Sequence, residues 1–136
     1  MAFEKQVSVE QGIVALISTN GIEKIATEFA QNLPLYYEWE GVSECPLNEA
    51  KFVEDYLRRK SGSPLKPYLL LFLMHRYRSA YAYLDYEEES DKRSETAEKY
   101  RQCFEASKME KDPLVNFIAE DMERQSRLFI KTEKRP

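Results

Sequence analysis

Apolar residues recur along this chain at spacings of three and four positions, which is the periodicity of amphipathic helices. The clearest stripe ends before Pro34 and consists of Ile22, Ile25, Ala26, Phe29, Ala30 and Leu33. The same periodicity, with cap residues and prolines at the boundaries, predicts helices near 9–18, 21–33, 46–60, 64–87, 92–109 and 113–130. The pattern therefore predicts an all-α fold.

Two of these helices are predicted to begin with a capping side chain followed by proline. Ser63-Pro64 and Asp112-Pro113 each offer an N-cap and then a proline at the first helical position, where the missing N–H costs nothing. The polar stretch after Glu87 contains no glycine or proline. Whether the helix that starts at 64 breaks near 88–91 therefore stays open.

The length of 136 residues, with 43% hydrophobic and 32% charged residues, is ordinary for one globular domain. We expect a single helical domain over 1–136, with about five to six main helices arranged as antiparallel helical hairpins. Two arrangements remain open, a bundle or a short α-solenoid-like stack of hairpin 46–87 on hairpin 92–130. Such a stack resembles tetratricopeptide-type helical hairpins, although their Trp, Gly, Tyr and Ala pattern at a period of about 34 residues is missing.

The charge and the apolar runs bear on the compartment and the class of partner. The formal net charge of −4 does not favour a nucleic-acid binder. The longest apolar run, 68–74, is far shorter than the roughly 20 residues of a membrane span. Because residues 1–11 have no apolar signal-peptide core, we expect a cytoplasmic protein. The alternative is an exported protein whose leader lies outside this sequence, in which Cys45 and Cys103 could form a disulfide.

The sequence contains no recognisable catalytic signature. It has no nucleophile-elbow or phosphate-binding glycine motif, and its two cysteines lack C-x-x-C spacing. The single histidine, His75, excludes a histidine-rich metal site within one subunit. We therefore expect no catalytic residue, no metal and no cofactor, and an enzyme is the less favoured class.

Two segments carry candidate binding residues. His75, Arg76 and Arg78 place cationic groups in an apolar helix, where they either pair with carboxylates of a neighbouring helix or line a groove for an anion or a partner. Aromatic residues near 36–39 either pack in the core or anchor a partner, with Trp39 as the best candidate for an exposed anchor. The candidate binding residues are Tyr36, Tyr37, Trp39, His75, Arg76 and Arg78.

These observations favour a small helical protein–protein interaction module without catalytic activity. Its expected partner is another protein or a second copy of the chain in a homodimer, and we expect no nucleic acid partner. The alternative is a small-molecule or anion-binding protein, including an enzyme, with a pocket near His75, Arg76 and Arg78.

Overall fold

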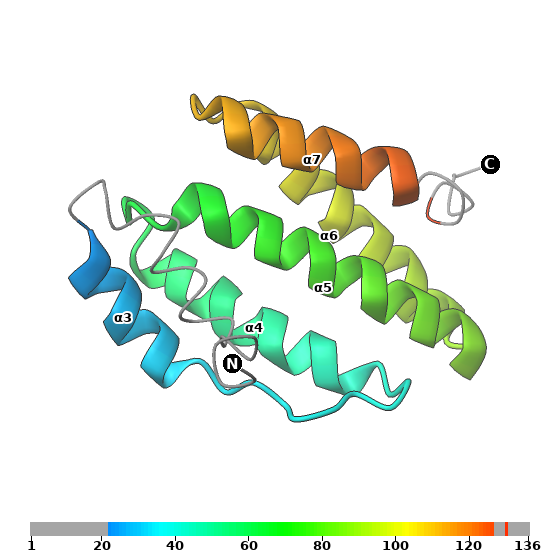
Figure 1. Ribbon diagram of the computed structural model, residues 1–136. Helices are drawn as coiled ribbons and strands as arrows, with labels where there is room; N and C mark the ends of the chain where they lie inside the picture. The colour runs from blue at the N-terminus through cyan, green and yellow to red at the C-terminus, as the bar shows by residue number, and fades with distance from the viewer. Residues whose placement is uncertain (1–21, 127–129, 131–136) are drawn as a thin grey trace, which may run out of the picture. The chain divides into compact units, whose positions relative to one another are not determined.

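The computed structural model describes residues 22–126 and 130. In these residues the chain forms five α-helices and no strand, which confirms the all-α class (Figure 1). The helices are α3 (Glu23–Asn32), α4 (Glu44–Arg59), α5 (Lys66–Glu87), α6 (Ser90–Lys108) and α7 (Pro113–Ser126). The predicted helix near 9–18 lies outside the described residues.

The chain divides by its internal contacts into two compact units, residues 1–34 and 35–136. Each unit is described by itself, and a single domain over the whole chain stays a prediction. In the first unit, α3 buries Ala26, Phe29 and Ala30, three members of the predicted apolar stripe. Leu33 follows in an extended conformation, because a following proline disfavours the helical conformation of the residue before it.

The second unit consists of consecutive antiparallel helix pairs. The end of α5 lies beside the start of α4, where the Ser43 hydroxyl donates to Oε1 of Glu87 at 2.7 Å. Helix α6 returns along α5, with the Ser107 hydroxyl 3.7 Å from the sulfur of Met74. Helix α7 returns along α6, and Nδ2 of Asn116 donates to the Ser107 carbonyl at 2.9 Å. Helices α4 and α6 therefore run in the same direction, with α5 between them in the view of Figure 1.

Helix α5 contacts α4, α6 and α7 and is covered on more than one side, as the apolar residues on its opposite faces predict. Its buried residues are Leu69, Leu70, Phe72, Leu73, Met74, Tyr77, Ala80, Tyr81 and Leu84. In the described part of the chain, no helix has both the length and the apolar character needed to cross a membrane.

The two predicted cap-plus-proline starts behave differently. Oδ1 of Asp112 accepts the backbone N–H of Leu114 at 2.9 Å, and α7 begins at the residue after Asp112, as predicted. The Ser63 hydroxyl accepts the N–H of Leu65 at 3.1 Å, yet α5 begins only at Lys66. A short turn therefore separates the Ser63 cap from the regular helix.

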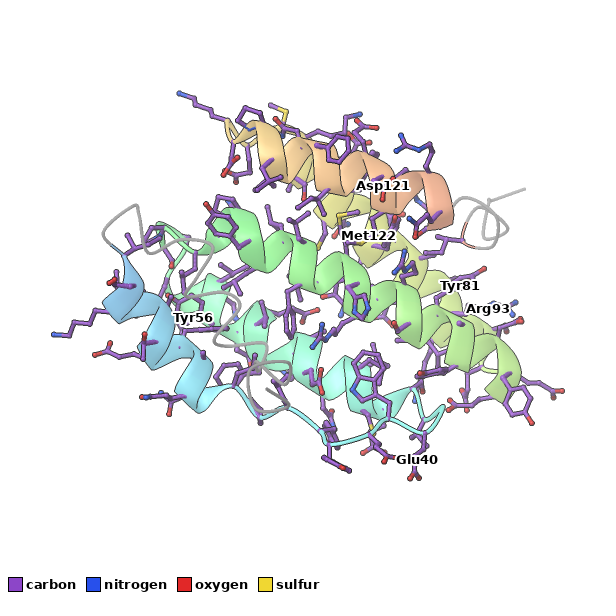
Figure 2. The ribbon with its side chains drawn as sticks, viewed as in Figure 1. Glu40, Tyr56, Tyr81, Arg93, Asp121 and Met122 are labelled. Carbon is purple, nitrogen blue, oxygen red and sulfur yellow. The ribbon has the colours of Figure 1, made fainter. Side chains whose placement is uncertain are left out.

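The helix that starts near 64 does break in the polar stretch, at Glu88. This residue has a left-handed backbone conformation with φ 62° and ψ 39°. The amide of Glu89 donates to the carbonyl of Leu84 at 3.1 Å, and the amide of Glu88 donates to that of Asp85 at 3.2 Å, which is the Schellman pattern of a helix end. The break lets α6 return along α5, and Figure 2 shows Tyr81 and Arg93 close together near this junction, with the Arg93 guanidinium 5.9 Å from the ring centroid.

Candidate functional site

A buried carboxylate, Glu49 of α4, joins α4 to α5 and to the segment that precedes α4. Glu49 is 1% exposed. Its Oε1 accepts a bond from Nε of Arg76 at 2.9 Å, and its Oε2 accepts bonds from the Trp39 indole N–H and from the backbone N–H of Tyr36, both at 2.9 Å. Three donors offset the loss of water around the carboxylate. We call Tyr36, Trp39, Glu49 and Arg76 the Glu49 clasp.

Arg76 of the clasp is held by aromatic rings as well as by the carboxylate. Its guanidinium carbon lies 3.7 Å from the ring centroid of Phe72 and 5.3 Å from that of Trp39. The faces of aromatic rings attract cations. Burial lowers the pKa of Arg76, while Glu49 raises it, and an arginine side chain keeps its charge in proteins. The clasp is therefore an ion pair enclosed by aromatic side chains.

The segment 35–43 is attached at both of its ends, and Figure 2 labels Glu40 within it. At one end Tyr36 is bound to Glu49 through its backbone, and its hydroxyl accepts a bond from Nδ2 of Asn48 at 2.8 Å. At the other end the Ser43 backbone N–H and hydroxyl donate to the Glu87 carboxylate at 3.0 and 2.7 Å, and these bonds lower the pKa of Glu87. With the Trp39 indole N–H bound to Glu49 between these ends, the segment is held against the α4–α5 pair at three residues.

The structure brings together four of the six candidate binding residues predicted from the sequence. Tyr36, Trp39 and Arg76 meet at Glu49, and the His75 ring centroid lies 5.9 Å from that of Trp39. Nδ1 of His75 is also 3.3 Å from a guanidinium nitrogen of Arg76. Arg76 therefore pairs with a carboxylate of a neighbouring helix, which is the first of the two environments that the sequence left open for it.

Tyr37 and Arg78 are not among the residues that donate to Glu49. Tyr37 is 97% exposed, whereas Trp39 is half-buried with its N–H bound to Glu49. Of these two residues, Tyr37 is therefore the one whose ring extends into solvent. Arg78 reaches α7, where one of its guanidinium nitrogens is 3.5 Å from Oε1 of Gln125.

A groove runs between α4 and α6. It consists of a cleft of about 410 Å³ and a second cleft of about 250 Å³, which share Glu54, Tyr77 and Lys99. The larger cleft is lined by the apolar side chains of Leu57 and Leu73. We call the two connected clefts the α4–α6 groove. None of the six predicted binding residues lines either cleft.

The shared part of the groove is a bridge between three helices. The Tyr77 hydroxyl of α5 donates to Oε2 of Glu54 on α4, and Nζ of Lys99 on α6 lies 3.4 Å from the same oxygen. Glu54 and Lys99 are both partly exposed, so solvent weakens this ion pair. The bridge therefore adds little to the stability of the fold. Its three residues mark the place where the two clefts meet.

Both described cysteines are free thiols. Cys45 is half-buried, and Cys103 is buried at the wall of the larger cleft. Burial raises the pKa of Cys103 to about 12. Because the thiolate is the nucleophilic form, Cys103 is protonated and unreactive at neutral pH.

Sequence reasoning missed Glu49 and the groove for different reasons. Glu49 gave a usable signal, since this carboxylate stands on the buried stripe of α4 with Ala50 and Val53. The groove gave none, because Glu54, Tyr77 and Lys99 come from three helices and meet only after folding. Among the residues that the structure describes, no three His, Cys, Asp or Glu side chains are grouped so as to hold a metal ion.

Comparisons of this chain with models of protein families, with curated proteins and with solved structures find no match. The helices of the described residues define the class, a small all-α protein. Its function has to be argued from the clasp and the groove.

We predict that Glu49→Gln lowers the free energy of unfolding by about 3 kcal/mol, because it leaves Arg76 buried without its charge partner. Urea denaturation followed by the fluorescence of Trp39 measures the change. Glu105→Gln, on an exposed part of α6 beside Lys108, is the matched control and should cost less than about 1 kcal/mol. Equal effects of the two substitutions would contradict the account of Glu49.

We also predict that His75 destabilises the fold as the pH falls. Burial, reinforced by Arg76 and Arg78, lowers the pKa of His75 to about 4 from its ordinary value of 6.5. Between these values the unfolded chain binds a proton that the folded chain does not, so stability is lost as the pH falls from 6.5 toward 4. From pH 7 to about 5, the wild type should lose about 1–2 kcal/mol more than His75→Asn in urea titrations. A parallel pH dependence of the two proteins would exclude this role.

Proposed function

We propose that this chain is a small helical protein–protein interaction module that binds a segment of a partner protein in the α4–α6 groove. The observation that carries the proposal is the groove itself, two connected clefts of about 410 and 250 Å³ between parallel helices. Helical proteins commonly receive a partner segment in an apolar groove of this kind.

The chemistry of the groove supports binding more than covalent catalysis. Its apolar side chains, such as Leu57 and Leu73, give a partner segment a surface to bury. Its polar groups at the centre, Glu54 and Lys99, are already paired with each other. The Cys103 thiol has its pKa raised to about 12 and is therefore a poor nucleophile.

A homodimer remains the alternative within the same class. Met109, Leu114 and Phe117 are 82%, 49% and 64% exposed. Leu114 and Phe117 are three residues apart on α7 and therefore lie on one face of it. This exposed apolar surface favours a second copy of the chain as a further partner. Tyr37, with its ring in solvent, stays a proposed partner contact.

The second class, a small-molecule or anion-binding protein with a pocket near His75, Arg76 and Arg78, receives less support. Arg76 is bound to Glu49, and Arg78 reaches toward α7. A ligand at Arg76 would have to compete with the buried carboxylate. We therefore favour the interaction module.

Affinity capture with a blocked groove tests the proposal. Gln102 is exposed and lines the larger cleft, so Gln102→Trp should fill the cleft without disturbing the core. Glu105→Trp places the same side chain on the same helix outside the groove. Proteins captured from a lysate of cells that express the chain are identified, purified and titrated against all three forms.

We expect at least one purified protein that binds the wild type and Glu105→Trp equally and Gln102→Trp at least about tenfold more weakly. If every captured protein binds the two tryptophan variants with the same affinity, the groove is not the docking surface and the proposal fails.

A further inference from the structure

The walls of the α4–α6 groove are cationic although the chain as a whole is acidic. Five cationic residues line the two clefts: Lys51, Arg58, Lys66, Lys92 and Lys99. Two carboxylates, Glu54 and Glu95, line them as well. The formal net charge of the whole chain is −4, so the sign of the charge is reversed in the groove.

Part of this positive charge is neutralised by neighbours. Glu54 pairs with Lys99, and Asp55, just outside the clefts, pairs with both Lys51 and Arg58. Even with Asp55 included, the cations outnumber the carboxylates by five to three. With Glu87, whose pKa Lys92 helps to lower, the count becomes five cations to four carboxylates, so a small positive excess remains.

Of the five cations that line the groove, Lys66 and Lys92 make no ion pair in the part of the chain that the structure describes, and they lie in different clefts. Lys92 is near enough to Glu87 to contribute to lowering the pKa of that carboxyl. Lys66 is the first residue of α5, and the first turn of α5 contains no acidic side chain to offset it. The N-terminus of a helix carries a partial positive charge, which adds to that of Lys66. The two clefts therefore each offer a positive group to a ligand that spans them.

We infer that the partner segment bound in the α4–α6 groove is acidic and amphipathic. This inference rests on the proposed function and names the chemistry of the partner. Apolar side chains of the segment would contact Leu57 and Leu73, and its carboxylates would pair with Lys66 and Lys92. The residues of α4 that line the groove run from Leu47 to Arg58, a distance of about 16 Å at 1.5 Å per residue.

A protein segment fits these features better than a nucleic acid. The floor of the groove is apolar, whereas a phosphate backbone requires a polar and cationic surface along its whole length. The net charge of −4 also repels a long polyanion outside the groove.

The test is a selection of random peptides of about 16 residues, long enough to span the groove as a helix, displayed and sorted for binding to the full chain. We expect the selected pool to be more acidic than the input pool. The leading peptide should bind Lys66→Glu/Lys92→Glu at least about tenfold more weakly than the wild type, and its affinity should fall with added salt.

Lys108→Glu/Lys111→Glu is the matched control, because it makes the same change in net charge with two exposed lysines outside the groove. It should bind the leading peptide like the wild type. A selected pool that is neutral or basic, an empty selection, or equal losses in the two double variants would each overturn the inference. So would a single-stranded oligonucleotide that binds through Lys66 and Lys92 more tightly than the leading peptide.

The outcomes separate the two claims. If Gln102→Trp weakens a purified partner while Lys66→Glu/Lys92→Glu does not, the groove remains the docking surface and the acidic partner is excluded. If Gln102→Trp weakens none, the proposed function itself fails.

Discussion

A buried carboxylate is tolerated only where donors replace the water that it has lost, and Glu49 obtains its donors from three residues in two parts of the chain. One is Arg76 in the middle of α5, and two come from the segment before α4. Any sliding of α4 along α5, or any lifting of this segment, would leave a charge buried without a partner. Glu49 therefore ties the position of α4 on α5 to the path of residues 35–43.

The same constraint determines the groove. Glu49 and Glu54 both reach α5 from α4, and their partners there, Arg76 and Tyr77, are consecutive residues. The buried ion pair thus sets the place where Tyr77 meets Glu54, and Lys99 completes the contact from α6. The shape of the groove is in this way coupled to the Glu49–Arg76 ion pair, although no clasp residue lines the groove.

The spacing of neighbouring residues predicted the helices. It could not predict which residues far apart in the sequence contact each other. The spacing of apolar residues predicted a central α5, and Asp112-Pro113 predicted the start of α7, because both depend on neighbours within a turn or two. The helix end at Glu88 could not be predicted, because a left-handed residue at a helix end is normally glycine and here it is glutamate. The sequence identified Arg76 as a charge that needs a partner. Only the fold shows that the partner is the carboxylate of Glu49.

The central claim is that the Glu49 carboxylate holds the segment before α4 through two N–H groups. Hydrogen exchange followed by NMR observes both of these protons, the indole N–H of Trp39 and the backbone amide of Tyr36, with the amide of Tyr37 as internal reference. We predict that the two bound protons exchange at least about tenfold more slowly than the Tyr37 amide, each rate being taken relative to that of the free group. Glu49→Met, whose side chain has no oxygen to accept the two N–H groups, should remove the difference. Exchange of all three protons at one rate in the wild type would contradict the claim.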